Sequence, residues 1–309
     1  MYATLIAVAA LWGASAGLLV PRAAYRFSVE PEDAWRDACP AGHALTGPAR
    51  GWLGSTRCTA CATADPAVST QTPRGLHPHP DTHPRPGPHP HPHPDTHPSP
   101  GPHPPPDTHP GASPGPEAPR PTPPRRGGPR YAPALLLPVI SALGCAAVAA
   151  TTGFRPELAV WLLLVPVAVL LAAVDHRVHR LPDRLTLPAA GAAAVLLGIA
   201  ALLPEHGGSW LSALLGGAGL GAFYLLLFLV NPNGMGFGDV KLALSLGVVL
   251  GWYGWAVVFA GGFAGFLFGA VYGLALMIMR RAGRATGIPF GPFMIAGALL
   301  GILLGGLAA

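Results

Sequence analysis

Long apolar stretches separated by short polar segments dominate this chain. A segment needs about 17 to 25 mostly apolar residues to cross a bilayer as a helix, because only a helix satisfies its own backbone hydrogen bonds in hydrocarbon. Eight stretches meet or approach that length, at about 3–20, 133–150, 157–174, 185–203, 209–230, 240–258, 260–279 and 288–307. The pattern predicts an all-α integral membrane protein, a bundle of about eight transmembrane helices.

The distribution of basic residues predicts the orientation of these helices. Eight Lys or Arg residues follow residue 134, and seven of them lie in or beside loops that eight crossings place on one side: Arg177, Arg180, Arg184, Lys241, Arg280, Arg281 and Arg284. Only Arg155 falls on the other side. Because positive charge is retained in the cytoplasm, the first side is predicted to be cytoplasmic and both termini to lie outside.

The chain divides into four parts. Residues 1–20 are predicted to form a retained first transmembrane helix, since no basic residue precedes this apolar stretch as in a cleaved signal. Residues 21–72 have a mixed composition typical of a small cytoplasmic domain. Residues 73–132 are rich in Pro and His and contain Pro-Asp-Thr-His-Pro three times, which predicts a disordered, extended linker. Residues 133–309 form the predicted seven-helix domain.

Composition agrees with this class. Half of the 309 residues are hydrophobic, only 11% are charged and the mean hydropathy is +0.42, which excludes an ordinary soluble domain. The formal net charge of +5 is explained by the loops described above and indicates no nucleic-acid partner. Histidines spaced by two residues in the linker do not converge on one point, so a solvated spacer is favoured there over a metal-binding segment.

Acidic residues are rare after residue 134. Because a charged side chain at membrane depth is costly, the presence of each one requires a structural or functional explanation. They are Glu157, Asp175, Asp183, Glu205 and Asp239. Glu157 and Glu205 fall in the short outer loops, where solvation accounts for them. The other three fall at the cytoplasmic border.

Asp175 ends the third apolar stretch and Asp239 opens the sixth, so both carboxylates are expected at one end of the bundle. Two close carboxylates can share one proton, so that one activates water while the other polarises a peptide carbonyl. Gly236 and Gly238 would allow the close backbone approach that an extended substrate needs. A simpler alternative stays open, in which Asp239 is a helix N-cap and Asp175 a solvated residue.

Three motifs together resemble the type IV prepilin peptidase family, within the Gly-x-Gly-Asp membrane aspartic proteases. They are Asp-x6-Pro-Asp at 175–183, Gly-x-Gly-Asp-Val-Lys at 236–241 and Ile-Pro-Phe-Gly-Pro-Phe at 288–293, and the resemblance spans about 133–307. It implies cleavage of the leader from prepilins or pseudopilins at the cytoplasmic face of the cell membrane. The implied catalytic residues are Asp175 and Asp239, without a cofactor for proteolysis.

The same resemblance assigns supporting roles around this pair. Asp183 is the weaker catalytic candidate, because helix capping explains a residue that follows Pro182. Lys241 either orients a carboxylate or extends to the lipid interface. His176 and His179 flank Asp175 and either tune its ionisation, contact lipid phosphates or are simply solvated. The expected partners are the apolar helix of a prepilin or pseudopilin and membrane lipid.

Many members of that family carry two Cys-x-x-Cys pairs between their first two helices. Here one pair is present as Cys58 and Cys61, whereas the other is reduced to Cys39 with His43 four residues later. Three cysteines and a histidine form an accepted structural zinc set, although idle thiols at a decayed site are the alternative. The missing cysteine puts N-methylation of the new N-terminus, which some relatives perform, in doubt.

Two other classes of function remain open. A small-ion or metal transporter would use the aspartates and histidines as a pathway, but such pathways need polar residues near the membrane midplane. A non-catalytic assembly factor of a pilus or secretion machine is the other alternative. Dispensable aspartates would favour this last class.

Overall fold

The computed structural model describes residues 1–29, 33–52, 54, 56–63, 135–232, 235–279 and 289–309. Within these ranges all regular secondary structure is helical, and extended segments meet only at one isolated bridge between Ala38 and Ala44. The predicted all-α class is therefore confirmed. The linker expected at 73–132 lies outside the described residues.

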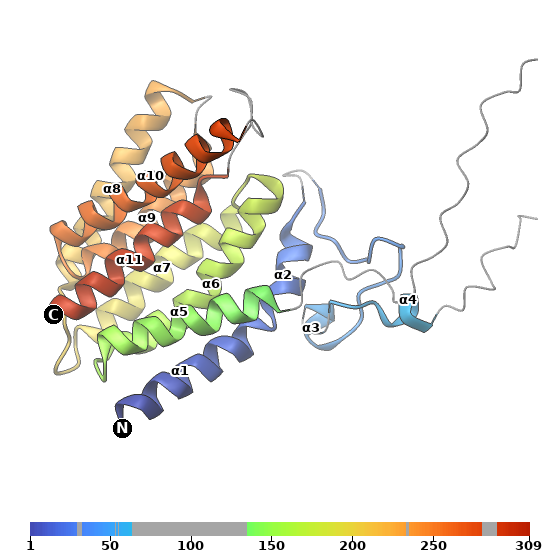
Figure 1. Ribbon diagram of the computed structural model, residues 1–309, viewed down its shortest axis with the longest axis horizontal. Coiled ribbons are helices and arrows are strands. Elements are labelled where there is room, and N and C mark those ends of the chain that lie inside the picture. The colour runs from blue at the N-terminus through green and yellow to red at the C-terminus, as the bar shows by residue number, and fades with distance from the viewer. Residues whose placement is uncertain (30–32, 53, 55, 64–134, 233–234, 280–288) are drawn as a thin grey trace, which may run out of the picture. The chain divides into compact units, whose positions relative to one another are not determined.

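Eight helices occupy the predicted apolar stretches (Figure 1). They are α1 (Tyr2–Gly17), α5 (Leu136–Thr152), α6 (Glu157–Val178), α7 (Asp183–Ala200), α8 (Trp210–Val230), α9 (Phe237–Gly251), α10 (Trp255–Ile278) and α11 (Gly291–Ala308). Helix α2 (Val20–Phe27) continues from α1 after a short turn, and α3 (Pro48–Gly51) and α4 (Thr59–Thr63) lie in the insert that follows, residues 28–63.

Six of these segments are long and apolar enough to cross a membrane: residues 2–27, α6, α7, α8, α10 and α11. Helix α5 is a shorter apolar helix, and α9 has 15 residues. The chain is a multi-pass membrane protein, and the total of eight spans stays a prediction.

The predicted boundary between the sixth and seventh stretches, at 258–260, is wrong. Helix α9 ends at Gly251 and α10 begins at Trp255. Gly254 lies between them with a φ of +101°, a conformation that favours glycine and breaks the helix. No polar residue marks this turn, so hydropathy alone could not locate it.

Glycines bring the helices into close contact. Lipid is as apolar as a leucine side chain, so helices associate in membranes through tight packing, which small residues allow. At the crossing of α8 and α9, a Cβ added at Gly216 would lie 2.7 Å from the carbonyl oxygen of Gly247. At the crossing of α10 and α11, a Cβ at Gly265 would lie 3.2 Å from the Cα of Met294. The crossing of α8 and α9 leaves no room for a methyl group at Gly216, and at Gly265 the neighbouring backbone would have to shift by a few tenths of an ångström.

Helix α6 lies at the centre of these contacts, because it packs against α1, α2, α5, α7 and α11. Helix α9 packs against α7, α8, α10 and α11. The ends of α6 and α9 that carry aspartates are therefore held in place by two shared neighbours, α7 and α11.

Glu157 corrects the interpretation that both outer-loop acids are solvated. Its side chain is 0% exposed at the start of α6, and its Oε1 accepts a hydrogen bond of 3.0 Å from the N–H of Gly207. Glu205 is exposed, as expected. The beginning of α6 therefore contacts the segment that joins α7 to α8. A sequence pattern does not reveal this contact between distant segments.

Substitution of alanine for Gly247 tests the packing of α8 on α9. The added methyl group would overlap the carbonyl of Gly216 and lie 2.9 Å from the Cα of Gly217, so we expect Gly247→Ala to lower the free energy of unfolding by about 1–3 kcal/mol. Gly191→Ala in α7 is the matched control, because nothing lies within 4 Å of its added Cβ. Equal stability of both variants in detergent, measured by thermal unfolding, would contradict this packing.

Candidate active site

Asp175 lies in the last turn of α6 and is 3% exposed. Its Oδ2 accepts a hydrogen bond of 3.0 Å from the N–H of Gly291, the first residue of α11. Helix N-termini carry a partial positive charge and free N–H groups, so they suit a carboxylate. The alternative in which Asp175 is a solvated residue after the helix is wrong.

Gly291 makes this hydrogen bond possible. A Cβ added at this position would lie 2.7 Å from Oδ2 and 3.1 Å from Cγ of Asp175. The chain between α6 and α7 also turns sharply here, with His179 at a φ of +52° and its N–H bonded to the carbonyl of Asp175. Both features fix the end of α6 against the beginning of α11.

Asp239 is the third residue of α9 and is 9% exposed. Gly236 is the N-cap of this helix, and the N–H of Asp239 bonds to its carbonyl at 3.0 Å. No side chain caps the helix, so the alternative of Asp239 as an N-cap is also wrong. Its carboxyl interacts electrostatically with Asp175 and with Tyr224, a buried residue of α8.

Both carboxylates line one cavity of about 1540 Å³. Its walls come from the ends of α6 and α8, the beginnings of α7 and α9, residues 289–290 and part of the insert. Gly238 lets the first turn of α9 approach the segment between α6 and α7, since a Cβ there would lie 3.2 Å from that of Leu181. Two interacting carboxylates on one cavity can share a proton and act as an acid and base pair.

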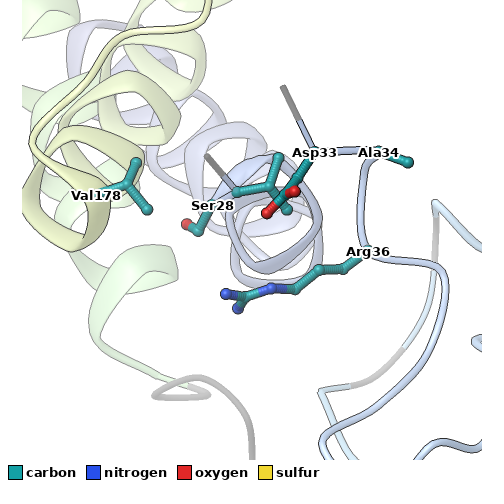
Figure 2. Close-up of a pocket in the computed structure, with 6 residues that line it drawn as sticks. Ser28, Asp33, Ala34, Arg36 and Val178 are labelled. Atoms are coloured by element: carbon teal, nitrogen blue, oxygen red, sulfur yellow. The ribbon is translucent and has the colours of Figure 1, made fainter. Parts of the chain in front are cut away.

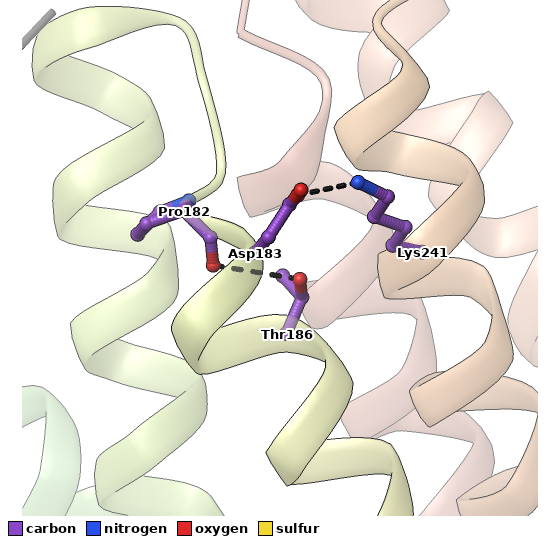
Figure 3. A network of polar contacts seen from close by, with 4 residues as sticks. All are labelled: Pro182, Asp183, Thr186 and Lys241. Atoms are coloured by element: carbon purple, nitrogen blue, oxygen red, sulfur yellow. Dashed lines mark hydrogen bonds and ion pairs between the residues drawn. The ribbon is translucent and has the colours of Figure 1, made fainter. Parts of the chain in front are cut away.

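Asp183 and Lys241 form an ion pair of 2.5 Å at the wall of this cavity (Figure 3). Asp183 is the first residue of α7, but Pro182 is the N-cap, so the side chain pairs with Lys241 rather than capping its helix. The Asp183 side chain is 61% exposed and that of Lys241 is 17% exposed. Of the two roles considered for Lys241, contact with a carboxylate is the one present.

Two residues of the site were not identified from sequence. Gly291 belongs to the Ile-Pro-Phe-Gly-Pro-Phe motif, where a glycine between Phe290 and Pro292 at a helix start signals close backbone contact. Tyr224 gave no signal, because it is one aromatic residue in an apolar helix. Its ring stacks on Phe266 at 5.4 Å beside the cavity wall.

The insert brings its four candidate metal ligands together. The ligand atoms of Cys39, His43, Cys58 and Cys61 lie within 4.8 Å of one another. The Sγ atoms of Cys39 and Cys61 are 3.7 Å apart, and His43 Nδ1 lies 3.1 Å from the Sγ of Cys61. Zinc–sulfur bonds of about 2.3 Å at tetrahedral angles place sulfurs about 3.7 Å apart, so this donor set fits zinc.

Two thiols of this cluster differ in their ionisation. Burial acts to raise the pKa of Cys39, but hydrogen bonds from the backbone of Ala41 and His43 outweigh it and lower the pKa to about 6. Burial and the neighbouring thiols raise the pKa of Cys61 to about 11. Crowded thiols resist joint ionisation unless a cation compensates their charge.

The part of the chain that carries both buried aspartates matches a known protein family. Residues 162–278 match the type IV leader peptidase family. The chain is similar to prepilin leader peptidase/N-methyltransferases of Aeromonas hydrophila (34% identical over 180 residues, 55% of this chain and 58% of that protein) and Aeromonas salmonicida strain A449 (32% over 154 residues, 47% and 48%). A Pseudomonas aeruginosa protein of the same name is 31% identical over 181 residues, 58% of this chain and 59% of that protein.

The chain thus spans about half the length of the curated relatives it matches. No solved structure matches it. The resemblance to this family is confirmed, and the matched region includes Asp175, Asp183 and Asp239, whereas the motif at 288–293 lies beyond it.

Proposed function

We propose that this protein, whose residues 162–278 belong to the type IV leader peptidase family, is a membrane aspartic endopeptidase for prepilins or pseudopilins. One observation carries the proposal. Asp175 and Asp239 are both buried, come from the ends of different helices, and interact across a single large cavity. Burying a charged carboxylate beside a membrane is costly. Sharing one proton for catalysis explains why two carboxylates are buried together here.

The proposed reaction needs only these two carboxylates and water. The ionised aspartate removes a proton from a water molecule, while the protonated aspartate donates a hydrogen bond to the peptide carbonyl oxygen. Water attacks the carbonyl carbon, and the tetrahedral intermediate collapses as a proton moves to the departing nitrogen. The N–H of Gly291 keeps one oxygen of Asp175 in position throughout.

The positions of the basic residues indicate how the protein is oriented in the membrane. Four of the five described basic residues after residue 135 lie at the end that carries the cavity, Arg177, Arg180, Arg184 and Lys241, and only Arg155 lies at the other end. By the positive-inside rule this end faces the cytoplasm. We therefore place the protein in the cytoplasmic membrane, with the substrate's apolar helix among the spans and its basic leader reaching the cavity from the cytoplasmic side.

The other classes of function gain no support. A transporter needs polar groups near the middle of its spans, whereas the acids of the described helices lie at helix ends: Glu157, Asp175, Asp183 and Asp239.

The names of the relatives also include N-methyltransferase. We do not extend that second activity to this chain, because the insert departs from the two Cys-x-x-Cys pairs to which it is linked.

We also propose that Cys39, His43, Cys58 and Cys61 hold a structural zinc ion. The donor set fits tetrahedral zinc, and the insert is otherwise small, with three buried core residues, Cys39, Leu45 and Cys58, that pack with Tyr25 of α2. When bound, the metal would cross-link segments 39–43 and 58–61. It would take no part in proteolysis.

Substitution of each aspartate tests the peptidase. Asp175→Asn and Asp239→Asn should each slow cleavage of a co-expressed prepilin by about 10²- to 10⁴-fold, because each removes one partner of the acid and base pair. Asp183→Asn is the matched control and should retain cleavage within a few-fold, since its carboxylate pairs with Lys241 at the rim. Full processing of a verified substrate by both dyad variants, at matched protein levels, would refute the proposal.

Gly291→Ala tests the positioning of Asp175 separately. The new methyl group would lie 2.7 Å from Oδ2, so the carboxylate must move, and displacement of a catalytic group by about 1 Å can cost about 10²-fold in rate. Cleavage by Gly191→Ala, where the methyl group meets open space, should match wild type. Normal activity in Gly291→Ala would show that the hydrogen bond is dispensable.

Metal content tests the zinc proposal. The purified full-length protein should contain about one zinc per chain by elemental analysis, and His43→Ala or Cys61→Ser should lose most of it. Cys145→Ala serves as the control, because Cys145 is buried in α5 away from the cluster. Zinc-free wild-type protein, purified without chelators, would overturn the assignment.

A further inference from the structure

A second, smaller cavity of about 360 Å³ lies where the insert meets the end of α6 (Figure 2). It shares Val29, Asp33, Ala34 and Val178 with the wall of the catalytic cavity, but Ser28 and Arg36 line only the smaller one. Its size falls in the lower part of the range for small-molecule sites, about 300 to 1,000 Å³. The proposed function leaves this cavity unexplained.

Arg36 lines this cavity, and Arg177 precedes the lining residue Val178 in the sequence. The Arg36 guanidinium extends beside Ser28 toward the end of α6, and it lies 5.0 Å from the ring centroid of Tyr25 (Figure 2). Arg177 is half-buried in the last turn of α6, next to the lining residue Val178, and the charges of the two arginines act on each other. Among the described residues, neither arginine has an acidic partner within salt-bridge distance. An anion between them would relieve their repulsion.

An acid lies on the same cavity without neutralising either arginine. Asp33 directs its carboxylate into the space drawn in Figure 2, and within the described part of the chain no ion pair joins it to Arg36. The cavity therefore presents positive and negative groups at separate positions. A ligand with an anionic and a cationic group a few bonds apart is complementary to this arrangement, whereas inorganic phosphate is not.

The position of the cavity along the helices further restricts the class of ligand that it would bind. It lies at the end of α6, where a long apolar helix gives way to His176, Arg177 and His179. Lipid headgroups occupy this level of a membrane, and guanidinium groups recognise phosphates through paired hydrogen bonds.

We propose that this cavity binds a phosphate and ammonium headgroup, that of phosphatidylethanolamine. The phosphate lies between Arg36 and Arg177, and the ammonium group faces Asp33. Because the cavity shares a wall with the catalytic cavity, a bound lipid would hold Ser28, Val29 and residues 33–36 against α6. Lipid binding does not depend on the proposed peptidase activity.

Native mass spectrometry of the full-length protein in detergent tests this site. Titration with phosphatidylethanolamine and with phosphatidylglycerol of equal chain length should show at least about tenfold tighter binding of the former, as expected for one additional charged contact. Arg36→Gln combined with Arg177→Gln should weaken phosphatidylethanolamine binding by about tenfold or more. Arg50→Gln is the control for each single substitution, Arg36→Gln and Arg177→Gln, since it removes one positive charge from an exposed residue outside the cavity.

Asp33→Asn distinguishes the headgroup from a general affinity for anionic lipid. Asp33 is exposed, so this variant should fold normally, keep phosphatidylglycerol binding and lose the preference for phosphatidylethanolamine. Free phosphoethanolamine and inorganic phosphate should not displace the lipid at equal concentration. Equal binding of the two lipids to wild type, an unchanged preference in Asp33→Asn, or displacement by inorganic phosphate would each overturn the proposal.

Discussion

The hydrogen bond from the N–H of Gly291 to Asp175 joins the end of one apolar helix to the beginning of another. Helix α6 carries Asp175 and helix α9 carries Asp239, and both pack against α7 and α11. The relative position of the two carboxylates therefore depends on how these shared neighbours are seated. Since Asp175 is tied to the first residue of α11, movement of that helix would move the site.

Close packing of glycines gives this arrangement its rigidity. Gly216 and Gly247 bring α8 and α9 into contact, and Gly238 admits the segment between α6 and α7 beside Asp239. In a membrane, such contacts replace the hydrophobic driving force that assembles soluble proteins.

Sequence predicted the parts of this protein that depend on local pattern. Span length located the helices, and the positions of Asp175 and Asp239 at the ends of apolar stretches placed them at one end of the bundle. The resemblance to the peptidase family pointed to Cys39, His43, Cys58 and Cys61 as candidate zinc ligands, and the structure brings their side chains together. Features that depend on contacts between distant segments were missed. Gly291 lies 116 residues from Asp175, Glu157 is covered by Gly207, and Gly254 breaks a helix within an unbroken apolar run.

Two carboxylates that share one proton are the centre of the proposed mechanism, and the pH dependence of cleavage tests them most directly. Initial rates would be measured for purified protein in liposomes with a verified prepilin, over a pH range in which the protein stays folded. A shared proton predicts a bell-shaped profile, because the pair is inactive when both groups are protonated and when both are ionised. A rate that continues to rise through alkaline pH would instead indicate a different nucleophile and contradict the dyad.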